Sequence, residues 1–121
     1  MLFDQPEPVP GGRDLGPSPL DVMAVSVAAC AHYFASAFLF GRKLSAEALR
    51  VEVEVEKTRE PTPRLGKVSL HVVLPPDVPE HYLSAIERAI RNCPAYGTLL
   101  HPPELRLTVA RPKSDAGAPA A

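Results

Sequence analysis

The fold of this chain is decided by residues 16–41, which read GPSPLDVMAVSVAACAHYFASAFLFG. Ser18 can cap a helix, Pro19 suits the first helical position, and Asp21 is an acidic residue three places after the cap. No formally charged residue lies between Val22 and Phe40, and the glycine that ends the stretch is typical of a helix terminus. The stretch therefore predicts a single helix of about 30 Å that is apolar on all sides.

A helix of this length and composition is also compatible with a membrane span. Against that reading, polar side chains are spread through its middle, at Ser26, Cys30, His32 and Ser36. The segments that follow also have apolar faces that need something to cover. We therefore expect a buried central helix and no membrane partner, and a single-span membrane protein remains the alternative.

The rest of the chain predicts strands and one short helix. Valines alternate with glutamates over residues 50–57, and apolar residues alternate again over 68–74, as in two antiparallel strands with one exposed face. The capping-box pattern at 77–80 predicts a helix to about Arg91, which Cys93-Pro94 ends. A last strand is predicted from three alternating residues, Leu105, Leu107 and Val109.

These elements predict an α+β protein in which a long buried central helix packs on an antiparallel sheet. Residues 1–111 form one predicted domain, and residues 112–121 form a predicted disordered tail. Three half-apolar strands and a short helix cover only part of a helix that is apolar all round. The remainder is expected to face a second copy of the chain, so the pattern predicts a two-fold homodimer.

Composition narrows the class of partner. The formal net charge is −1 and the chain has no strongly basic stretch, which argues against nucleic acid as the main partner. The chain has two cysteines, and its N-terminus shows neither a basic start nor an apolar core of a signal peptide. These features predict a cytoplasmic protein whose cysteines are redox-active, metal-binding or incidental rather than a structural bridge.

Two motifs carry a family resemblance. Gly16-Pro17-Ser18-Pro19 leads into the apolar helix that contains Ala28-Ala29-Cys30, and Asn92-Cys93-Pro94 ends the second helix after an alternating strand. This order and spacing resembles the OsmC/Ohr family of thiol-dependent peroxidases. The resemblance implies an intertwined homodimer with its active sites at the interface, no cofactor, and organic hydroperoxides as the substrate class.

The resemblance also implies roles for the cysteines. Cys30 would be the peroxidatic thiol, which a peroxide oxidises to sulfenic acid, and Cys93 would be the resolving thiol, which condenses with it to a disulfide. An external dithiol reductant would restore both. If residues 94–100 form a helical turn, Cys93 lies at its N-terminal end, where the helix dipole is expected to lower a thiol pKa.

Helical spacing places an apolar, substrate-binding face around Cys30, formed by Met23, Ser26, Val27, Tyr33 and Phe34. Peroxidase members of the family have a glutamate ten residues before the first cysteine, which orients an arginine. This chain has Leu20 there, and Arg13 is the only basic residue of the N-terminal arm and the candidate substitute cation. The departure leaves a second hypothesis open: a non-catalytic relative that binds a small apolar ligand at the dimer interface.

Other polar residues have simpler interpretations. The stripe Glu52, Glu54 and Glu56 is read as the solvated face of a strand. His32 lies about 200° around the helix from Cys30 and is read as a packing or interface residue. The remaining histidines, together with the cysteines, lack the spacing of a metal site, so no metal is predicted.

Overall fold

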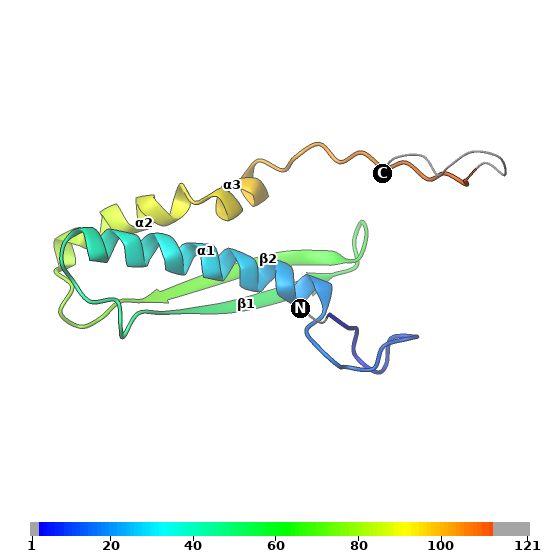
Figure 1. Cartoon of the computed structure of the whole chain (residues 1–121), viewed down its shortest axis with the longest axis horizontal. Coiled ribbons are helices and arrows are strands. Elements are labelled where there is room, and N and C mark those ends of the chain that lie inside the picture. Colours follow the sequence, from blue (N-terminus) through cyan, green and yellow to red (C-terminus); the bar gives the residue numbers. More distant parts are fainter. Residues whose placement is uncertain (1–2, 113–121) are drawn as a thin grey trace.

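A computed structural model describes residues 3–112 of the 121-residue chain. The central helix lies between a β-hairpin on one side and two shorter helices on the other (Figure 1). The predicted α+β class, with a long central helix on an antiparallel sheet, is confirmed. In chain order the elements are α1 (Pro19–Gly41), β1 (Arg50–Thr58), β2 (Arg64–Val73), the 3-10 helix η1 (Glu80–Tyr82), α2 (Leu83–Arg91) and α3 (Pro94–Leu100).

The ends of α1 follow the sequence expectation. The Ser18 hydroxyl accepts a hydrogen bond of 3.2 Å from the Asp21 amide, and Pro19 occupies the first helical position. At the other end, the Arg42 amide donates to the Leu39 carbonyl at 3.0 Å, which closes the last turn. These hydrogen bonds stabilise both ends of the helix against which the rest of the chain packs.

The hairpin presents its valines to α1 and its charged residues to solvent. Val53 pairs with Leu70 and Val55 with Val68, and the alternate glutamates of β1 are exposed. β2 begins at Arg64, four residues earlier than Val68, where the sequence alternation begins. A register shift between Glu56 and Lys57 accounts for this, because it interrupts the period-2 pattern at that point.

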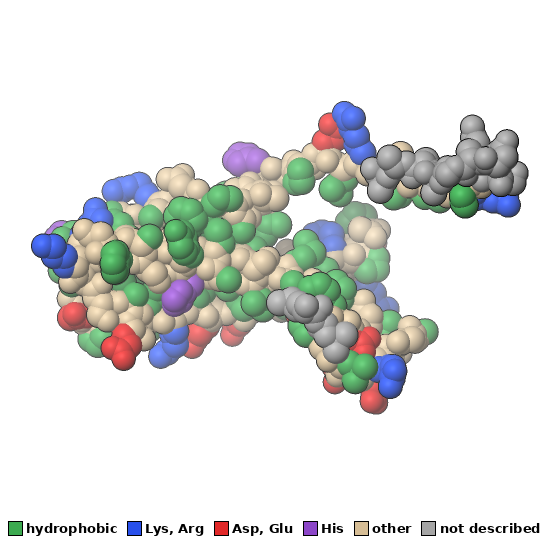
Figure 2. Space-filling model, viewed as in Figure 1, with side chains coloured by type: hydrophobic (Ala, Val, Ile, Leu, Met, Phe, Trp, Pro, Cys, Tyr) green, Lys and Arg blue, Asp and Glu red, His purple; other side chains and the backbone are tan. Residues whose placement is uncertain are grey.

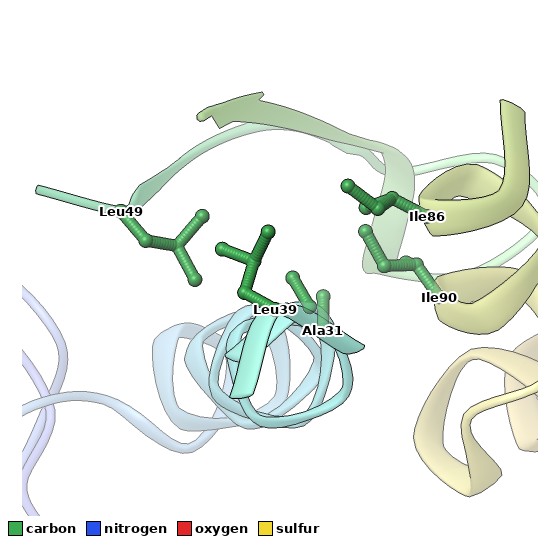
Figure 3. Packing of buried hydrophobic residues seen from close by; sticks show 6 residues of the cluster. Ala31, Leu39, Leu49, Ile86 and Ile90 are labelled. Atoms are coloured by element: carbon green, nitrogen blue, oxygen red, sulfur yellow. The ribbon is translucent and has the colours of Figure 1, made fainter. Parts of the chain in front are cut away.

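The core lies where α1, α2 and the start of β1 meet (Figure 3). Ala31, Ala35 and Leu39 are fully buried and lie four residues apart, so they form one line along α1. They pack against Leu49, just before β1, and against Ile86 and Ile90 of α2. Burying a side chain such as Leu39 contributes on the order of 2 kcal/mol, which makes this cluster the main fastening between the layers.

The predicted start of the second helix is wrong. The side chain of Asp77 makes no capping bond, and residues 75–78 form a turn in which the Val78 amide donates to the Pro75 carbonyl at 3.2 Å. Pro79 disfavours helical geometry at the residue before it, and Pro79 itself is extended, with ψ of 140°. The helical segment therefore begins only after Pro79, as η1 followed by α2.

The predicted last strand is also wrong for a single chain. Leu105, Leu107 and Val109 are 90%, 87% and 89% exposed, and residues 102–112 adopt no regular structure. A strand needs a partner edge, and this extension leads away from the body of the molecule (Figure 1). Residues 113–121 of the predicted tail lie outside the described residues.

One side of α1 remains uncovered. Its buried residues face the hairpin and the other helices, whereas Tyr33 and Phe40 are 66% and 83% exposed. Hydrophobic side chains also lie at the surface of the body and along the C-terminal extension (Figure 2). By length and composition α1 could cross a membrane. This is weak evidence for a membrane span, because the core helix of a soluble protein has the same properties.

Candidate thiol site

Two cysteines from distant parts of the sequence lie beside one another. Cys30 is in the middle of α1, and Cys93 lies between α2 and α3. Both are free thiols that interact with each other. Cys93 is 0% exposed, whereas Cys30 is half-buried. A reagent from solvent therefore has easier access to the sulfur of Cys30.

Cys93 is the N-cap residue of α3. Its backbone is extended, with φ of −71° and ψ of 143°, and Pro94 follows at the first helical position. The Tyr96 amide donates a hydrogen bond of 3.4 Å to Cys93 Sγ, as an amide three residues on does at a serine cap. The predicted helical turn after Cys93 is confirmed, and it places the sulfur at the helix start.

The pKa of Cys93 is nevertheless raised above its ordinary value of 9.0, so the expected lowering is wrong. Burial has the largest effect on this pKa, because it removes water from around the thiolate. The Tyr96 amide opposes burial by stabilising the anion, and the neighbouring Cys30 thiol raises the pKa further. Cys93 is therefore a thiol, not a thiolate, at neutral pH.

An apolar hollow of about 570 Å³ lies next to the thiol pair, between the first half of α1, β2 and α3. Leu20, Met23 and Val27 line it from α1, and Val27 is one turn before Cys30. Tyr96, one turn after Cys93, lines it from α3. The volume is typical of sites for small organic ligands. Neither cysteine lines the hollow, but Cys30 follows Val27 by one turn of α1 and Cys93 precedes Tyr96 by three residues, so the thiol pair adjoins two of its lining residues.

A second hollow, of about 370 Å³, lies between β2 and α2. Val72, Leu83, Ile86 and Ile90 line it, so it too is mainly apolar. Among the described residues, β2 and α2 have no Cα atoms within 8 Å of each other, which leaves this space open. Val68, Leu70 and Tyr96 belong to the lining of both hollows.

The structure brings together only some of the residues that the sequence nominated. Leu20, Met23 and Val27 meet at the hollow beside Cys30. The hydroxyl of Ser26 is exposed and donates to the Met23 carbonyl at 2.7 Å, so it is not directed at the thiol.

The other nominated residues lie elsewhere. Tyr33 is on the exposed side of α1, where its ring meets the half-buried ring of Phe34 edge-on at 5.4 Å. Arg13 is exposed in the N-terminal loop, and its backbone amide donates to Asp4 Oδ2 at 3.1 Å. Neither Tyr33 nor Arg13 lines the hollow beside the thiols. Within residues 3–112, no three histidine, cysteine or acidic side chains are close enough to hold a metal ion.

Sequence reasoning missed Tyr96 and its neighbour Arg91. The Arg91 guanidinium donates to the Tyr96 hydroxyl at 3.4 Å and lies 3.8 Å from a carboxylate oxygen of Glu87. The position of Tyr96 three residues after Cys93 could have signalled its amide bond to the sulfur, because that is the spacing of an N-cap. Nothing in the local sequence indicates the two hollows that Tyr96 lines.

Comparison with solved structures identifies the fold. A proposed osmotic stress induced and detoxification response protein from Psychrobacter arcticus 273-4 matches with a TM-score of 0.71 and 18% sequence identity, over 79% of this chain and 69% of that one. An organic hydroperoxide resistance protein OsmC from Legionella pneumophila matches with a TM-score of 0.60 and 23% identity, over 79% of this chain and 70% of that one. At these identities the likeness establishes a shared α+β fold.

The family follows from the sequence itself. Residues 11–108 match the model of the OsmC-like protein family, so the chain belongs to that family. The matched range includes both cysteines and every element of regular structure. No curated protein matches the chain. Membership of the family indicates a function related to peroxides or redox chemistry.

Proposed function

We propose that this protein reduces organic hydroperoxides by a two-cysteine mechanism, in which Cys30 attacks the peroxide and Cys93 resolves the product. The observation that carries the proposal is the pair itself: two free thiols lie beside one another, next to residues that line a mainly apolar hollow. The hollow suits the organic part of a hydroperoxide, and the resemblance to an organic hydroperoxide resistance protein is consistent with that substrate.

In the first step the Cys30 thiolate attacks the terminal oxygen of the hydroperoxide. An S–O bond forms, the O–O bond breaks, and the departing alkoxide takes a proton, so the products are a sulfenic acid and an alcohol. In the second step the Cys93 sulfur attacks the Cys30 sulfur, a disulfide forms and water leaves. A dithiol reductant then returns two electrons and two protons and restores both thiols.

Accessibility and protonation support this division of roles. Cys30 is the more accessible sulfur for a substrate, because it is half-buried whereas Cys93 is fully buried. The raised pKa of Cys93 keeps it protonated until a sulfenic acid forms beside it. A buried thiol that meets no solvent oxidant and has one sulfur neighbour is suited to resolving rather than to attacking.

We also propose that the working form is a homodimer in a reducing, cytoplasmic compartment. The uncovered side of α1 and the C-terminal extension both present large apolar side chains, among them Tyr33, Phe40 and Leu105. Exposed apolar faces of this kind mark interaction surfaces. The surface charge of the chain is close to neutral and gives no reason to expect nucleic acid as a partner.

The proposal is tested by counting free thiols after reaction of the reduced protein with cumene hydroperoxide. We expect one equivalent of peroxide to remove both thiols together and one equivalent of dithiol to restore them. In Cys93→Ser the reaction should stop at a Cys30 sulfenic acid, detected as a dimedone adduct by mass spectrometry. In Cys30→Ser, Cys93 should stay reduced. Retention of both thiols in the wild-type protein would refute the mechanism.

A second function has one specific observation in its favour. Leu20 lines the hollow at the position where peroxidase members of the family have a glutamate. The part of the wall that α1 supplies is apolar, while Arg64 and Lys67 of β2 are the charged residues of the lining. An apolar wall on the side of the thiols suits a protein that binds a small apolar ligand without reacting with it. This alternative would be supported if the protein binds an apolar alcohol such as octanol and does not react with cumene hydroperoxide.

A further inference from the structure

Tyr96 lines two neighbouring hollows. The larger lies between α1, β2 and α3, and the smaller between β2 and α2; the lining of both includes Tyr96. Both also share Val68 and Leu70 of β2. The two hollows therefore lie in line along one apolar strand face, and the side chain of Tyr96 is the part of the helical layer common to both.

Tyr96 makes two hydrogen bonds, one through its backbone amide and one through its ring hydroxyl. Its backbone amide is bonded to Cys93 Sγ at 3.4 Å, and its hydroxyl accepts from the Arg91 guanidinium at 3.4 Å. Arg91 is itself 3.8 Å from Glu87 on the next turn of α2. The contact with Arg91 directs the ring hydroxyl toward α2, and the backbone bond stabilises the start of α3, from which the ring projects.

We propose that Tyr96 limits the length of the apolar chain that lies beside the thiols, by closing the larger hollow against the smaller one. With the ring in place, the space next to Cys30 is about 570 Å³; without it, the space continues into a further 370 Å³ along Val68 and Leu70. Wild-type protein then favours compact hydroperoxides over long linear ones. The identity of the ligand as a hydroperoxide rests on the proposed function; the role of Tyr96 as a partition rests on the hollows alone.

The test is the ratio of kcat/KM for a linear eighteen-carbon fatty acid hydroperoxide to that for cumene hydroperoxide. We expect Tyr96→Ala to raise this ratio about tenfold, since each methylene that gains an apolar site is worth a factor of this order. Tyr96→Phe, which keeps the ring and loses the Arg91 contact, should stay within about twofold of wild type. Tyr96→Leu should give an intermediate ratio, and it carries the test if the alanine variant does not fold.

Leu99→Ala is the matched control. Leu99 lines only the larger hollow, so its loss enlarges the site without joining the two hollows. The control should therefore change the rates for both substrates without favouring the longer one. An unchanged ratio in folded Tyr96→Leu and Tyr96→Ala, or an equal increase in Leu99→Ala, would overturn the proposal.

A second readout separates this inference from the peroxidase function. Binding of octanoic and octadecanoic acid to the Cys30→Ser protein is measured by calorimetry, with and without Tyr96→Ala. A gain in octadecanoic acid affinity on Tyr96→Ala, together with a wild-type protein that reduces no peroxide, would sustain the partition and reject the enzyme. Peroxidase activity with no effect of Tyr96 on either chain-length preference would sustain the enzyme and reject the partition.

Discussion

The fully buried thiol of Cys93 lies beside the half-buried thiol of Cys30, although 62 residues separate them in the sequence (93 minus 30, less one). The packing of α1 against α2 and α3 creates this proximity. It also determines how each thiol ionises, because the environment of Cys93 consists of protein groups and of the other sulfur. The reactivity of the pair is therefore a property of the tertiary structure.

Removing the Cys30 thiol should lower the pKa of Cys93. Burial, the largest effect, still raises this pKa in Cys30→Ala, but the contribution of the neighbouring thiol is lost. Alkylation of Cys93, followed by mass spectrometry across pH, should show its midpoint at a lower pH in Cys30→Ala than in wild type. A midpoint that stays in place or moves upward would contradict the interaction of the two thiols.

The same raised pKa has a consequence for stability. A thiol that holds its proton more tightly in the folded state than in the unfolded state stabilises the fold below its unfolded pKa, and this contribution is lost as pH rises toward the folded pKa. The free energy of unfolding of the reduced protein should therefore fall above about pH 9. Urea titrations at pH 7 to 10 measure it, and Cys93→Ser should show a smaller decline.

The cap of α3 can be tested by exchanging its acceptor atom. Cys93→Ser keeps an acceptor for the Tyr96 amide, whereas Cys93→Ala removes it. We expect the alanine variant to be about 1 kcal/mol less stable to urea than the serine variant. Hydrogen exchange at the Tyr96 amide should be faster in the alanine variant. Equal exchange rates in the two variants would show that the sulfur makes no contribution as a cap.

Asp4 organises the N-terminal loop. Its carboxylate accepts hydrogen bonds from the amides of Leu15, Gln5 and Arg13, and these bonds lower its pKa below 3.8, with Leu15 the largest contributor. Because the pKa of Asp4 is lowered on folding, its ionised carboxylate stabilises the loop above about pH 3.8. This stabilisation is lost as the pH falls through the pKa of Asp4 in the folded state.

Trypsin cleavage after Arg13 reports the order of this loop at neutral pH. Asp4→Asn should increase the cleavage rate several-fold, because a neutral amide is a weaker acceptor than a carboxylate. Glu7→Gln is the matched control, because it changes an exposed carboxylate in the same segment. Equal cleavage of the two variants would be contrary to the role of Asp4.

Among the core residues, Leu39 is the one whose truncation should lower the free energy of unfolding most. It is 0% exposed and packs among Ala35, Leu49 and Ile86. We expect Leu39→Ala to reduce the free energy of unfolding by about 2–5 kcal/mol, and Leu39→Met, which keeps the volume, to cost less than about 1.5 kcal/mol. Denaturant unfolding measures both. Similar losses for the two variants would mean that packing volume is not what this position contributes.

The proposed dimer predicts a sedimentation result. At micromolar concentration the wild-type chain should sediment at twice the mass of one chain, and Tyr33→Asp should shift it toward the monomer, because an exposed ring on α1 is replaced by a charge. Arg88→Asp, on the exposed side of α2, should have no such effect. A monomeric wild-type protein would refute the proposal.

Much of the fold could be predicted because its signals are local. Ser18 and Pro19 mark the start of α1, and the alternating valines mark β1. The failures have nonlocal causes. The register shift at Glu56 hides the start of β2, and Leu105 belongs to a strand-like pattern for which the single chain supplies no partner edge.

The candidate site was less predictable than the fold. The resemblance singled out Cys30 and Cys93, but the net shift of the Cys93 pKa depends on burial by segments distant in sequence. Ser26 was expected on the thiol face by helical spacing, yet its hydroxyl bonds to its own helix. The place of Tyr96 at the hollows results from the packing of α3 against α1, which no local pattern encodes.

The sulfur of Cys93 has two roles, one in the structure of α3 and one in the proposed reaction. In the proposed cycle Cys93 Sγ, the acceptor of the Tyr96 amide, also becomes one of the two sulfurs of the disulfide, and a sulfur bonded to another sulfur is a weak acceptor. On this proposal oxidation would loosen the start of α3, and reduction would restore its cap. A cap made in the reduced state favours that state, so the disulfide is expected to yield readily to an incoming dithiol.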